Sequence, residues 1–271
     1  MNRRLAQWSL CGFLILVSLQ LKAQFPYGTT GLLHMPTAEM QRDKTFMFGG
    51  SFLDIAATPG HWDYGTFNYY INITLFPWLE IGYTCTLHKG SPGNYWPKQT
   101  WGKFVNQDRQ FSGRFRLLKE GELFRFMPSI VLGANDPSTN DLFTEGKNDY
   151  GIRGVGVSGN GHWNRYYLAL TKHFSLKGIG ELGIHLAYVY NKRKDYHLNG
   201  PALGANFRFH LPLVYPFIRV ANCLNLMAEY DSHTVNFGME CNVWKDYINA
   251  VIEFNRCRYF SGGLVFKVHL K

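Results

Sequence analysis

The chain has 271 residues, of which 46% are hydrophobic and 16% aromatic but only 17% charged, and it contains 28 glycines. Soluble domains carry about 25% charged residues and about 7% glycine, so this chain has few charges and many aromatic rings. The composition excludes a disordered chain and a coiled coil. The length suits a single all-β unit, because β-sandwiches and barrels often run to about 200–250 residues.

The N-terminal segment has the three parts of a secretory signal peptide. Arg3 and Arg4 precede an apolar run over residues 10–19, and the small residue Ala23 follows. The apolar run is shorter than the roughly 20 residues that a membrane-spanning helix needs. We therefore predict a signal peptide over residues 1–23, with cleavage near Ala23 and a single domain over residues 24–271.

The charge left after cleavage is moderate. Residues 1–23 contain three basic and no acidic side chains, so a chain with 28 basic and 19 acidic residues would keep a net charge of +6. No block of five or six like charges occurs, which argues against a nucleic-acid partner.

The mature chain has the period of two that is typical of β-strands. In one stretch Phe67, Ile71 and Leu75 occupy one phase, while Asn68 and Asn72 occupy the other. The same alternation predicts twelve strands, near residues 45–53, 66–76, 79–87, 110–118, 124–133, 164–174, 181–190, 202–211, 219–230, 234–244, 247–256 and 260–270. Most of these are about as long as a membrane-crossing β-strand, which has roughly 9–11 residues.

The connections between the predicted strands alternate in length over the first two thirds of the chain. Residues 54–65, 88–109, 134–163 and 191–201 form long connections, and short ones lie between them. Outer-membrane barrels have short turns on one side and long loops on the other, with an even number of strands. The pattern favours a transmembrane antiparallel β-barrel of about 12 strands (range 10–14) in the outer membrane of a Gram-negative bacterium.

A secreted β-sandwich is the alternative fold, with its apolar face packed on a second sheet. Large aromatic residues crowd the apolar phase, as they do in the girdles of a membrane barrel. Charged and ionisable side chains occupy the opposite phase, where they would face a polar lumen. These predicted lumen residues are Glu80, Arg114, Arg116, Glu181, His185, Glu229, Glu240 and Glu253.

The start of the mature chain resembles a known family. Residues 31–40 read Gly-Leu-Leu-His-Met-Pro-Thr-Ala-Glu-Met, and Asp43 and a Gly-Gly-Ser stretch at residues 49–51 follow. This is similar to the opening of the YjbH-like outer-membrane barrel family, which has glycine-leucine, a short gap, proline, threonine or serine, alanine, a basic residue and methionine. Glu39 stands where that family has a basic residue, and Lys44 stands where it has glycine.

Later stretches agree with the same family in order and character, namely residues 128–136, 166–174 and 226–231, with Asn236 and Gly238 on the return strand. The resemblance implies a non-enzymatic barrel associated with production, export or surface attachment of an exopolysaccharide. It implies outer-membrane lipid as a partner, together with polysaccharide and other envelope proteins.

No catalytic, cofactor or metal motif stands out. The mature cysteines Cys85, Cys223, Cys241 and Cys257 lack the paired close spacing of a zinc site, and no disulfide between them is predicted. Several histidines, such as His185 and His233, leave open an outer-membrane lipid- or glycan-modifying enzyme, but no Gly-x-Ser-x-Gly motif accompanies them.

The long connection over residues 88–109 combines aromatic and cationic side chains. Tyr95, Trp96, Lys98, Trp101 and Lys103 could engage the rings and acidic groups of a polysaccharide. Equally, tyrosine and tryptophan gather at membrane interfaces, and cations meet anionic lipid head groups there.

Residues 24–44 are a lead-in that either packs inside the barrel or begins the sheet. Barrels of eight strands are filled by side chains, and wide channels appear at about sixteen strands, so we expect a filled or narrow lumen. A narrow porin-like channel therefore remains an alternative function.

Overall fold

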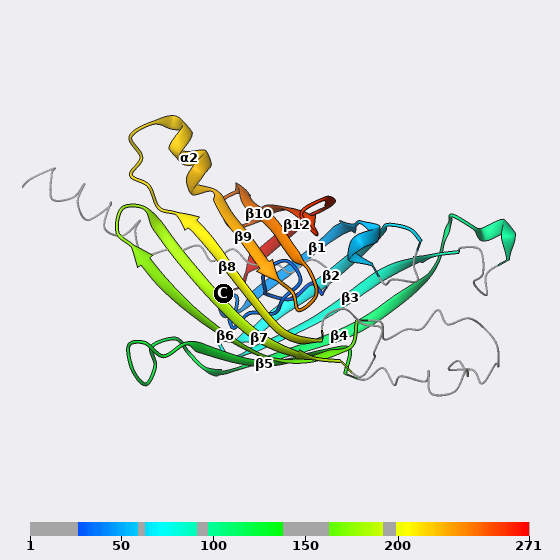
Figure 1. Cartoon of the computed structure of the whole chain (residues 1–271), viewed down its shortest axis with the longest axis horizontal. Coiled ribbons are helices and arrows are strands. Elements are labelled where there is room, and N and C mark those ends of the chain that lie inside the picture. Colours follow the sequence, from blue (N-terminus) through cyan, green and yellow to red (C-terminus); the bar gives the residue numbers. More distant parts are fainter. Residues whose placement is uncertain (1–26, 59–62, 91–96, 138–162, 192–198, 271) are drawn as a thin grey trace, which may run out of the picture.

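The computed structural model describes residues 27–58, 63–90, 97–137, 163–191 and 199–270. The predicted signal peptide lies outside these residues. Twelve strands follow one another and close into an antiparallel barrel in which each strand pairs with its sequence neighbours and β1 pairs with β12 (Figure 1). The strands are β1 Thr45–Leu53, β2 Thr66–Phe76, β3 Leu79–Lys89, β4 Phe104–Leu118, β5 Ser129–Asn135, β6 Arg165–Leu176, β7 Gly180–Tyr190, β8 Gly200–Phe209, β9 Leu224–Tyr230, β10 Val235–Trp244, β11 Ile248–Asn255 and β12 Tyr259–His269. The predicted twelve-stranded β-barrel is confirmed.

The two faces of the barrel wall follow the alternation in the sequence. Along β2, Phe67, Tyr69 and Ile71 are exposed, while Asn68 and Asn72 are buried toward the lumen. A closed barrel satisfies every backbone group between neighbouring strands, so it can present such an apolar outside to lipid. The protein is therefore a transmembrane β-barrel of the outer-membrane type.

Aromatic side chains cluster at both rims of the wall. At one rim, Trp78 stacks on Phe76 at 5.2 Å and on Phe115 at 6.1 Å between ring centroids. At the other rim, Phe67 packs against Phe52 at 5.3 Å and against Phe104 at 6.2 Å. The two clusters have the positions of the aromatic girdles that flank the apolar band of membrane barrels.

The connections define two ends of the barrel. The turn end holds residues 77–78, 119–128, 177–179, 210–223 and 245–247, and the described residues of the loop end are 54–58, 63–65, 90, 97–103, 136–137, 163–164, 191, 199, 231–234 and 256–258. In the last third of the chain, where no alternation of connection lengths was predicted, the two final loop-end connections are tight turns and residues 210–223 form a longer connection at the turn end. In outer-membrane barrels the short turns face the periplasm, which assigns the turn end to that side.

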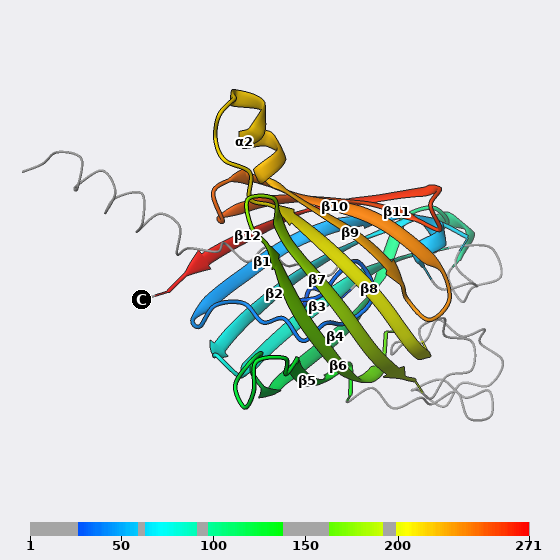
Figure 2. The ribbon, with the colours of Figure 1, turned by 60° about the vertical axis from the view of Figure 1, so that its left-hand side comes forward.

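A helix replaces the start of the predicted strand 219–230. Helix α2 spans Pro216–Asn222, and β9 begins only at Leu224. Proline at the first helical position supplies a favourable φ and lacks only a donor that would be unpaired there. The helix stands away from the wall at the turn end, and Phe217 and Val220 are exposed on it (Figure 2). Within the described residues, no helix has both the length and the apolar character to cross a membrane.

Two other predicted boundaries were wrong. Strand β4 begins at Phe104 rather than at residue 110, because its first residues continue the pairing with β3 as far as Lys89 opposite Phe104. The strand predicted at 124–133 lies at Ser129–Asn135 instead, because the Met127 N–H donates to the Phe124 carbonyl at 3.0 Å and forms a turn.

Candidate functional site: the lead-in segment inside the barrel

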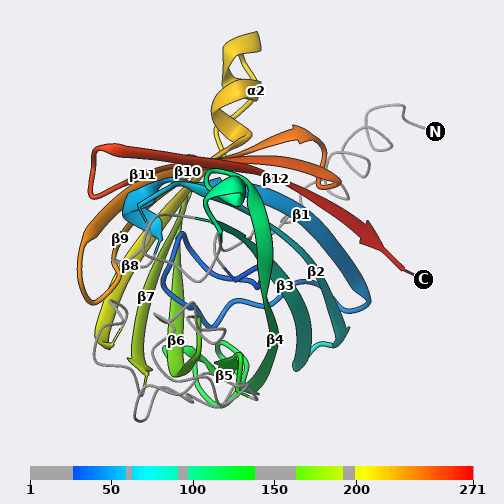
Figure 3. The same ribbon diagram turned by 90° about the vertical axis from the view of Figure 1, so that its right-hand side faces the viewer.

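The lead-in enters the lumen instead of adding to the wall. Every residue from 27 to 41 is buried, and Figure 3 shows this dark-blue stretch inside the ring of strands. It has no regular helix or strand; an isolated bridge joins Gly31 to Pro36, and the Leu32 N–H donates to the Met35 carbonyl at 3.2 Å. Of the two expected placements, the structure has the one inside the barrel.

A single carboxylate from β9 binds the tight turn of the lead-in. The Glu229 oxygens accept hydrogen bonds from the backbone N–H groups of Leu33 at 3.0 Å, His34 at 2.7 Å and Met35 at 3.2 Å. Asn236 donates to the same carboxylate at 3.2 Å. Hydrogen bonds to an ionised acceptor are the stronger kind, so Glu229 is a main attachment of the lead-in.

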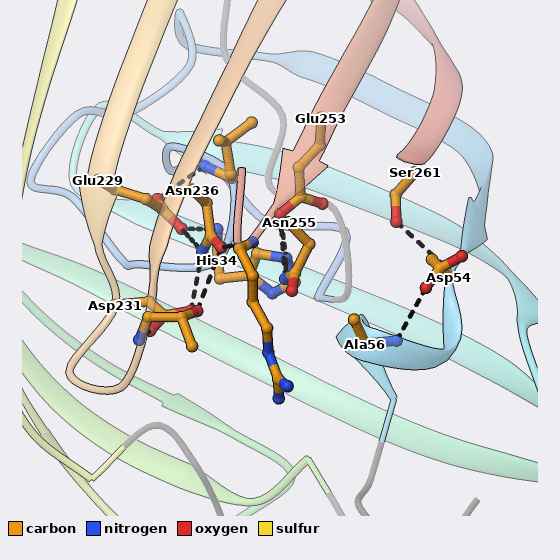
Figure 4. Close-up of polar contacts among 12 residues, drawn as sticks. His34, Asp54, Ala56, Glu229, Asp231, Asn236, Glu253, Asn255 and Ser261 are labelled. Atoms are coloured by element: carbon orange, nitrogen blue, oxygen red, sulfur yellow. Dashed lines mark hydrogen bonds and ion pairs between the residues drawn. The ribbon is translucent and has the colours of Figure 1, made fainter. Parts of the chain in front are cut away.

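His34 links the same turn to two other strands. Its Nε2 lies 2.6 Å from Glu253 on β11 (Figure 4), and its carbonyl accepts a hydrogen bond from Arg165 Nη1 on β6 at 2.8 Å. The Arg165 guanidinium lies 3.3 Å from the centroid of the Tyr27 ring, a cation–π contact with the start of the lead-in.

An ion pair on the opposite wall holds both ends of the lead-in. Arg114 on β4 and Glu80 on β3 lie 2.9 Å apart, and both side chains are fully buried. Glu80 accepts hydrogen bonds from the N–H and hydroxyl groups of Thr30, at 2.8 and 2.7 Å. Arg114 donates to the carbonyls of Thr37 and Glu39. The pair is therefore satisfied by the lead-in as well as by itself, which buried charges require.

Glycines in the wall make room for the apolar side chains of the lead-in. A Cβ added at Gly204 on β8 would lie 2.4 Å from Leu32 Cδ1, and one added at Gly238 on β10 would lie 2.6 Å from Leu33 Cδ2. These distances are shorter than real carbon contacts, so a larger residue at either position would displace the lead-in. Together with the polar contacts, this packing leaves residues 27–41 as a plug in the lumen.

A cavity of about 640 Å³, which we call the vestibule, lies at the turn end beneath the plug. Its inner side is lined by Ala38, Glu39 and Met40 of the lead-in. The other lining residues include Arg116, Lys119, Glu120, His173, Lys245, Asp246 and Tyr247. Glu39, which stands where the family has a basic residue, lies 2.8 Å from His173 Nε2. Lys44, which replaces a glycine of the family pattern, has φ of 54°, in the left-handed region that glycine favours.

The predicted lumen residues divide into groups by their contacts. Four of them, Glu80, Arg114, Glu229 and Glu253, contact the lead-in. Arg116 lines the vestibule, and Glu181 lies 3.5 Å from Arg208. His185 is buried between Thr171 at 2.9 Å and Asn206 at 2.8 Å, and Glu240 is buried on β10.

Sequence reasoning missed three basic residues of the lumen. Arg165, Arg208 and Lys267 are buried and pair with or donate to wall and lead-in groups. Each of them lies on the polar phase of a predicted strand, so the alternation that selected the acidic residues could have identified them as well.

The predicted glycan-contact residues lie apart from the plug. Tyr95 and Trp96 fall outside the described residues. Lys98, Trp101 and Lys103 are exposed at the loop end, with Lys98 Nζ 5.9 Å from the Trp101 ring. Contact of Lys98, Trp101 and Lys103 with a glycan stays a prediction, and these residues lie at the end of the barrel opposite to the vestibule.

The four cysteines of the described chain are free. Cys85 is buried although it lies on the outward phase of β3, and its Sγ lies 3.3 Å from Gln107 Oε1. Among the residues that the structure describes, no group of histidine, cysteine and acidic side chains has the arrangement of a metal site.

The His34–Glu253 pair makes the stability of the plugged barrel depend on pH. Burial, the largest single influence, disfavours the charged imidazole, but the carboxylates of Glu253, Glu229 and Asp231 together outweigh it and raise the pKa of His34 to about 9. Because this pKa lies above the ordinary value of about 6.5, protonated His34 stabilises the fold fully below pH 6.5, by on the order of 3 kcal/mol, and this contribution is lost as the pH rises through 9. We expect the gel-shift melting temperature to fall over that range. His34→Gln should flatten this part of the profile; an unchanged profile would contradict the assignment.

Comparison with known proteins identifies the N-terminal half of the chain. Residues 23–146 match the family model YjbH, which is described as "Exopolysaccharide biosynthesis protein YbjH". This segment is YjbH-like. The predicted resemblance is confirmed here, and the matched segment contains the whole plug, Glu80 and Arg114. The later stretches of resemblance, in β6, β9 and β10, lie beyond the match. A search of curated protein sequences found no match.

Solved structures with similar backbones are remote in sequence from this chain. An outer membrane channel from Pseudomonas putida F1 has 9% identity and a TM-score of 0.39, covering 87% of this chain and 98% of that one. Outer membrane phospholipase A from Escherichia coli has 11% identity and a TM-score of 0.32, with coverages of 85% and 97%. The low-pH structure of OprB from Pseudomonas putida has 8% identity and a TM-score of 0.24, with coverages of 83% and 91%.

Proposed function

We propose that this protein is a non-enzymatic outer-membrane β-barrel that acts in the production, export or surface attachment of an exopolysaccharide. The observation that carries the proposal is the YjbH match, which is described by exopolysaccharide biosynthesis and spans residues 23–146. This segment includes the plug and the Glu80–Arg114 pair that holds it. The matched sequence thus includes the part of the molecule that fills the lumen.

The filled lumen supports a binding or scaffolding role over a porin-like channel. Both a passive channel and an export conduit need an open path, whereas here one segment of the chain occupies the barrel centre and bonds to β3, β4, β6, β9 and β11. An export role would accordingly need partner proteins to provide the path, while a surface-attachment role would not.

The enzyme alternative has less support from the described residues. His185 is fully buried, its ring lies between Thr171 and Asn206, and the Thr171 hydroxyl oxygen already accepts the Ala38 N–H at 2.9 Å. A nucleophile must be within reach of its substrate, and this hydroxyl is covered by the plug. The arrangement suits a structural attachment of the lead-in.

A deletion strain tests the proposal. We expect removal of the gene to lower surface and secreted exopolysaccharide severalfold, measured by sugar analysis of the cell-bound and medium fractions, and expect the wild-type gene to restore it. Normal glycan in both fractions would contradict the proposal. A lipid or glycan conversion by the purified protein that is lost in His185→Ala or His233→Ala, with the barrel still folded, would favour the enzyme instead.

A further inference from the structure

The charges around the vestibule do not balance. Three of its acids are paired with basic residues of the wall: Glu39 with Arg208 at 3.7 Å, Glu120 with Lys172 at 3.0 Å and Asp246 with Lys267 at 3.6 Å. His173 and His269 also contact these carboxylates. The fourth acid, Asp43, has no ion pair among the described residues.

Four cations line the same cavity, and none of them makes an ion pair within the described part of the chain. They are Arg42, Arg116, Lys119 and Lys245. Arg116 Nε is buried and has no hydrogen-bond partner in the structure. Four unpaired cations against one unpaired acid give the vestibule a positive potential, and a buried guanidinium donor without an acceptor is costly unless a ligand supplies one.

The other residues that line the vestibule suit the binding of a sugar. Tyr247 is partly exposed at the rim, and Met40 and Pro77 add apolar surface beside the cations. A volume of about 640 Å³ falls within the range of small-molecule sites, about 300–1,000 Å³. Apolar and aromatic surface with a few convergent polar groups is the usual composition of such sites.

We propose that the vestibule binds an acidic saccharide from the periplasmic side, with a sugar carboxylate received by Arg116, Lys119 and Lys245. The guanidinium of Arg116 offers the planar pair of donors that a carboxylate accepts, and the two lysines supply further positive charge. The proposal rests on the proposed function and extends it by naming the class of saccharide and the face on which it binds. The plug closes the inner side of the vestibule, so the site receives the saccharide without passing it through the barrel.

The test compares charged and neutral forms of one oligosaccharide. Titration calorimetry on the purified full barrel in neutral detergent would use tri-galacturonic acid and its methyl ester, which has the same sugar rings but carries methyl groups in place of the carboxylate charges. We expect the acid to bind and the ester to bind at least about tenfold more weakly, a ratio that corresponds to about 1.4 kcal/mol. Equal affinity for the two forms would overturn the proposal.

Matched variants place the binding site. Lys119→Gln with Lys245→Gln removes two exposed cations from the vestibule, and Lys98→Gln with Lys103→Gln removes two exposed cations from the loop end. The first pair should weaken binding of the acid about tenfold, and the second pair should leave it unchanged. Loss of binding in the second pair alone would move the site to the other face and overturn the proposal. A gel shift on heating verifies that each variant is folded.

Inorganic phosphate distinguishes a saccharide site from a simple anion site. If phosphate competes with tri-galacturonic acid at comparable affinity, the vestibule is an anion site without preference for sugar, and the saccharide assignment fails. Two strains separate failure of this inference from failure of the proposed function. Normal exopolysaccharide in a strain that carries Lys119→Gln and Lys245→Gln would refute the role of the vestibule. Normal exopolysaccharide in the deletion strain would refute the proposed function itself.

Discussion

Deletion of residues 27–41 should turn a silent barrel into a conducting one. In planar bilayers we expect no steady conductance from the wild-type protein, because the lead-in fills the lumen and every one of its residues from 27 to 41 is buried. In size, a twelve-stranded barrel lies between the packed eight-stranded barrels and the wide channels of about sixteen strands. An unplugged lumen should therefore raise the current about tenfold or more above the background current of the wild-type protein.

The control for this deletion is a chain in which residues 27–41 are replaced by a Gly/Ser linker of equal length. It keeps the spacing to β1 and the backbone groups, but it lacks the Leu32 and Leu33 side chains that pack at Gly204 and Gly238 and the His34 imidazole that pairs with Glu253, so it should conduct as well. A folded deletion variant that stays silent would show that other residues close the barrel, and a conducting wild type would restore the porin-like alternative.

Glu229→Ala should destabilise the protein more than other single changes in the lumen. It leaves the N–H groups of Leu33, His34 and Met35 without their acceptor in a buried place. Each unsatisfied buried donor costs about 1–3 kcal/mol, and breaking a buried charged contact costs about 3–5 kcal/mol, so we expect a loss of about 3–5 kcal/mol. The midpoint of urea unfolding in detergent measures it.

Two further variants show whether the effect acts through the plug. Glu229→Gln keeps one acceptor oxygen and should give an intermediate loss. Glu240→Gln changes a glutamate of similar burial on the next strand, from which no hydrogen bond to the lead-in is seen among the described residues, so it should lower the urea midpoint less than Glu229→Ala does. If Glu240→Gln lowers the midpoint as much as Glu229→Ala does, the specific role of the Glu229 contact would be refuted.

The wall of the barrel was predictable because its information is local. Side chains along each strand face the lipid and the lumen in turn, so the residue type at every second position indicates which way a side chain faces. This pattern was sufficient to predict that Glu80, Arg114 and Glu229 face the lumen. The same local pattern was ambiguous at residues 213–220, where an apolar run fits a strand as well as α2. The proline at residue 216, the first helical position, is the signal that could have distinguished them.

The plug was not predictable in the same way. The lead-in has no period, and its conformation depends on partners far along the chain, such as Glu229, which is 195 residues from His34. The pairing of acids and cations around the vestibule is equally non-local, since Asp246 and Lys267 come from different parts of the wall. The alternation in the sequence identifies such residues as inward-facing, but which of them come into contact depends on how the barrel closes.

The position of the plug in the chain also constrains the order of assembly. The plug immediately precedes β1, and β1 closes the ring by pairing with β12, the last strand, with the Leu270 N–H donating to the Lys44 carbonyl at 2.8 Å. Once this seam has formed, an N-terminal segment left outside could enter only by threading through the turn end. The lead-in must therefore associate with the curved sheet while the seam is open, so residues 27–41 are in place before β12 pairs with β1 and encloses them.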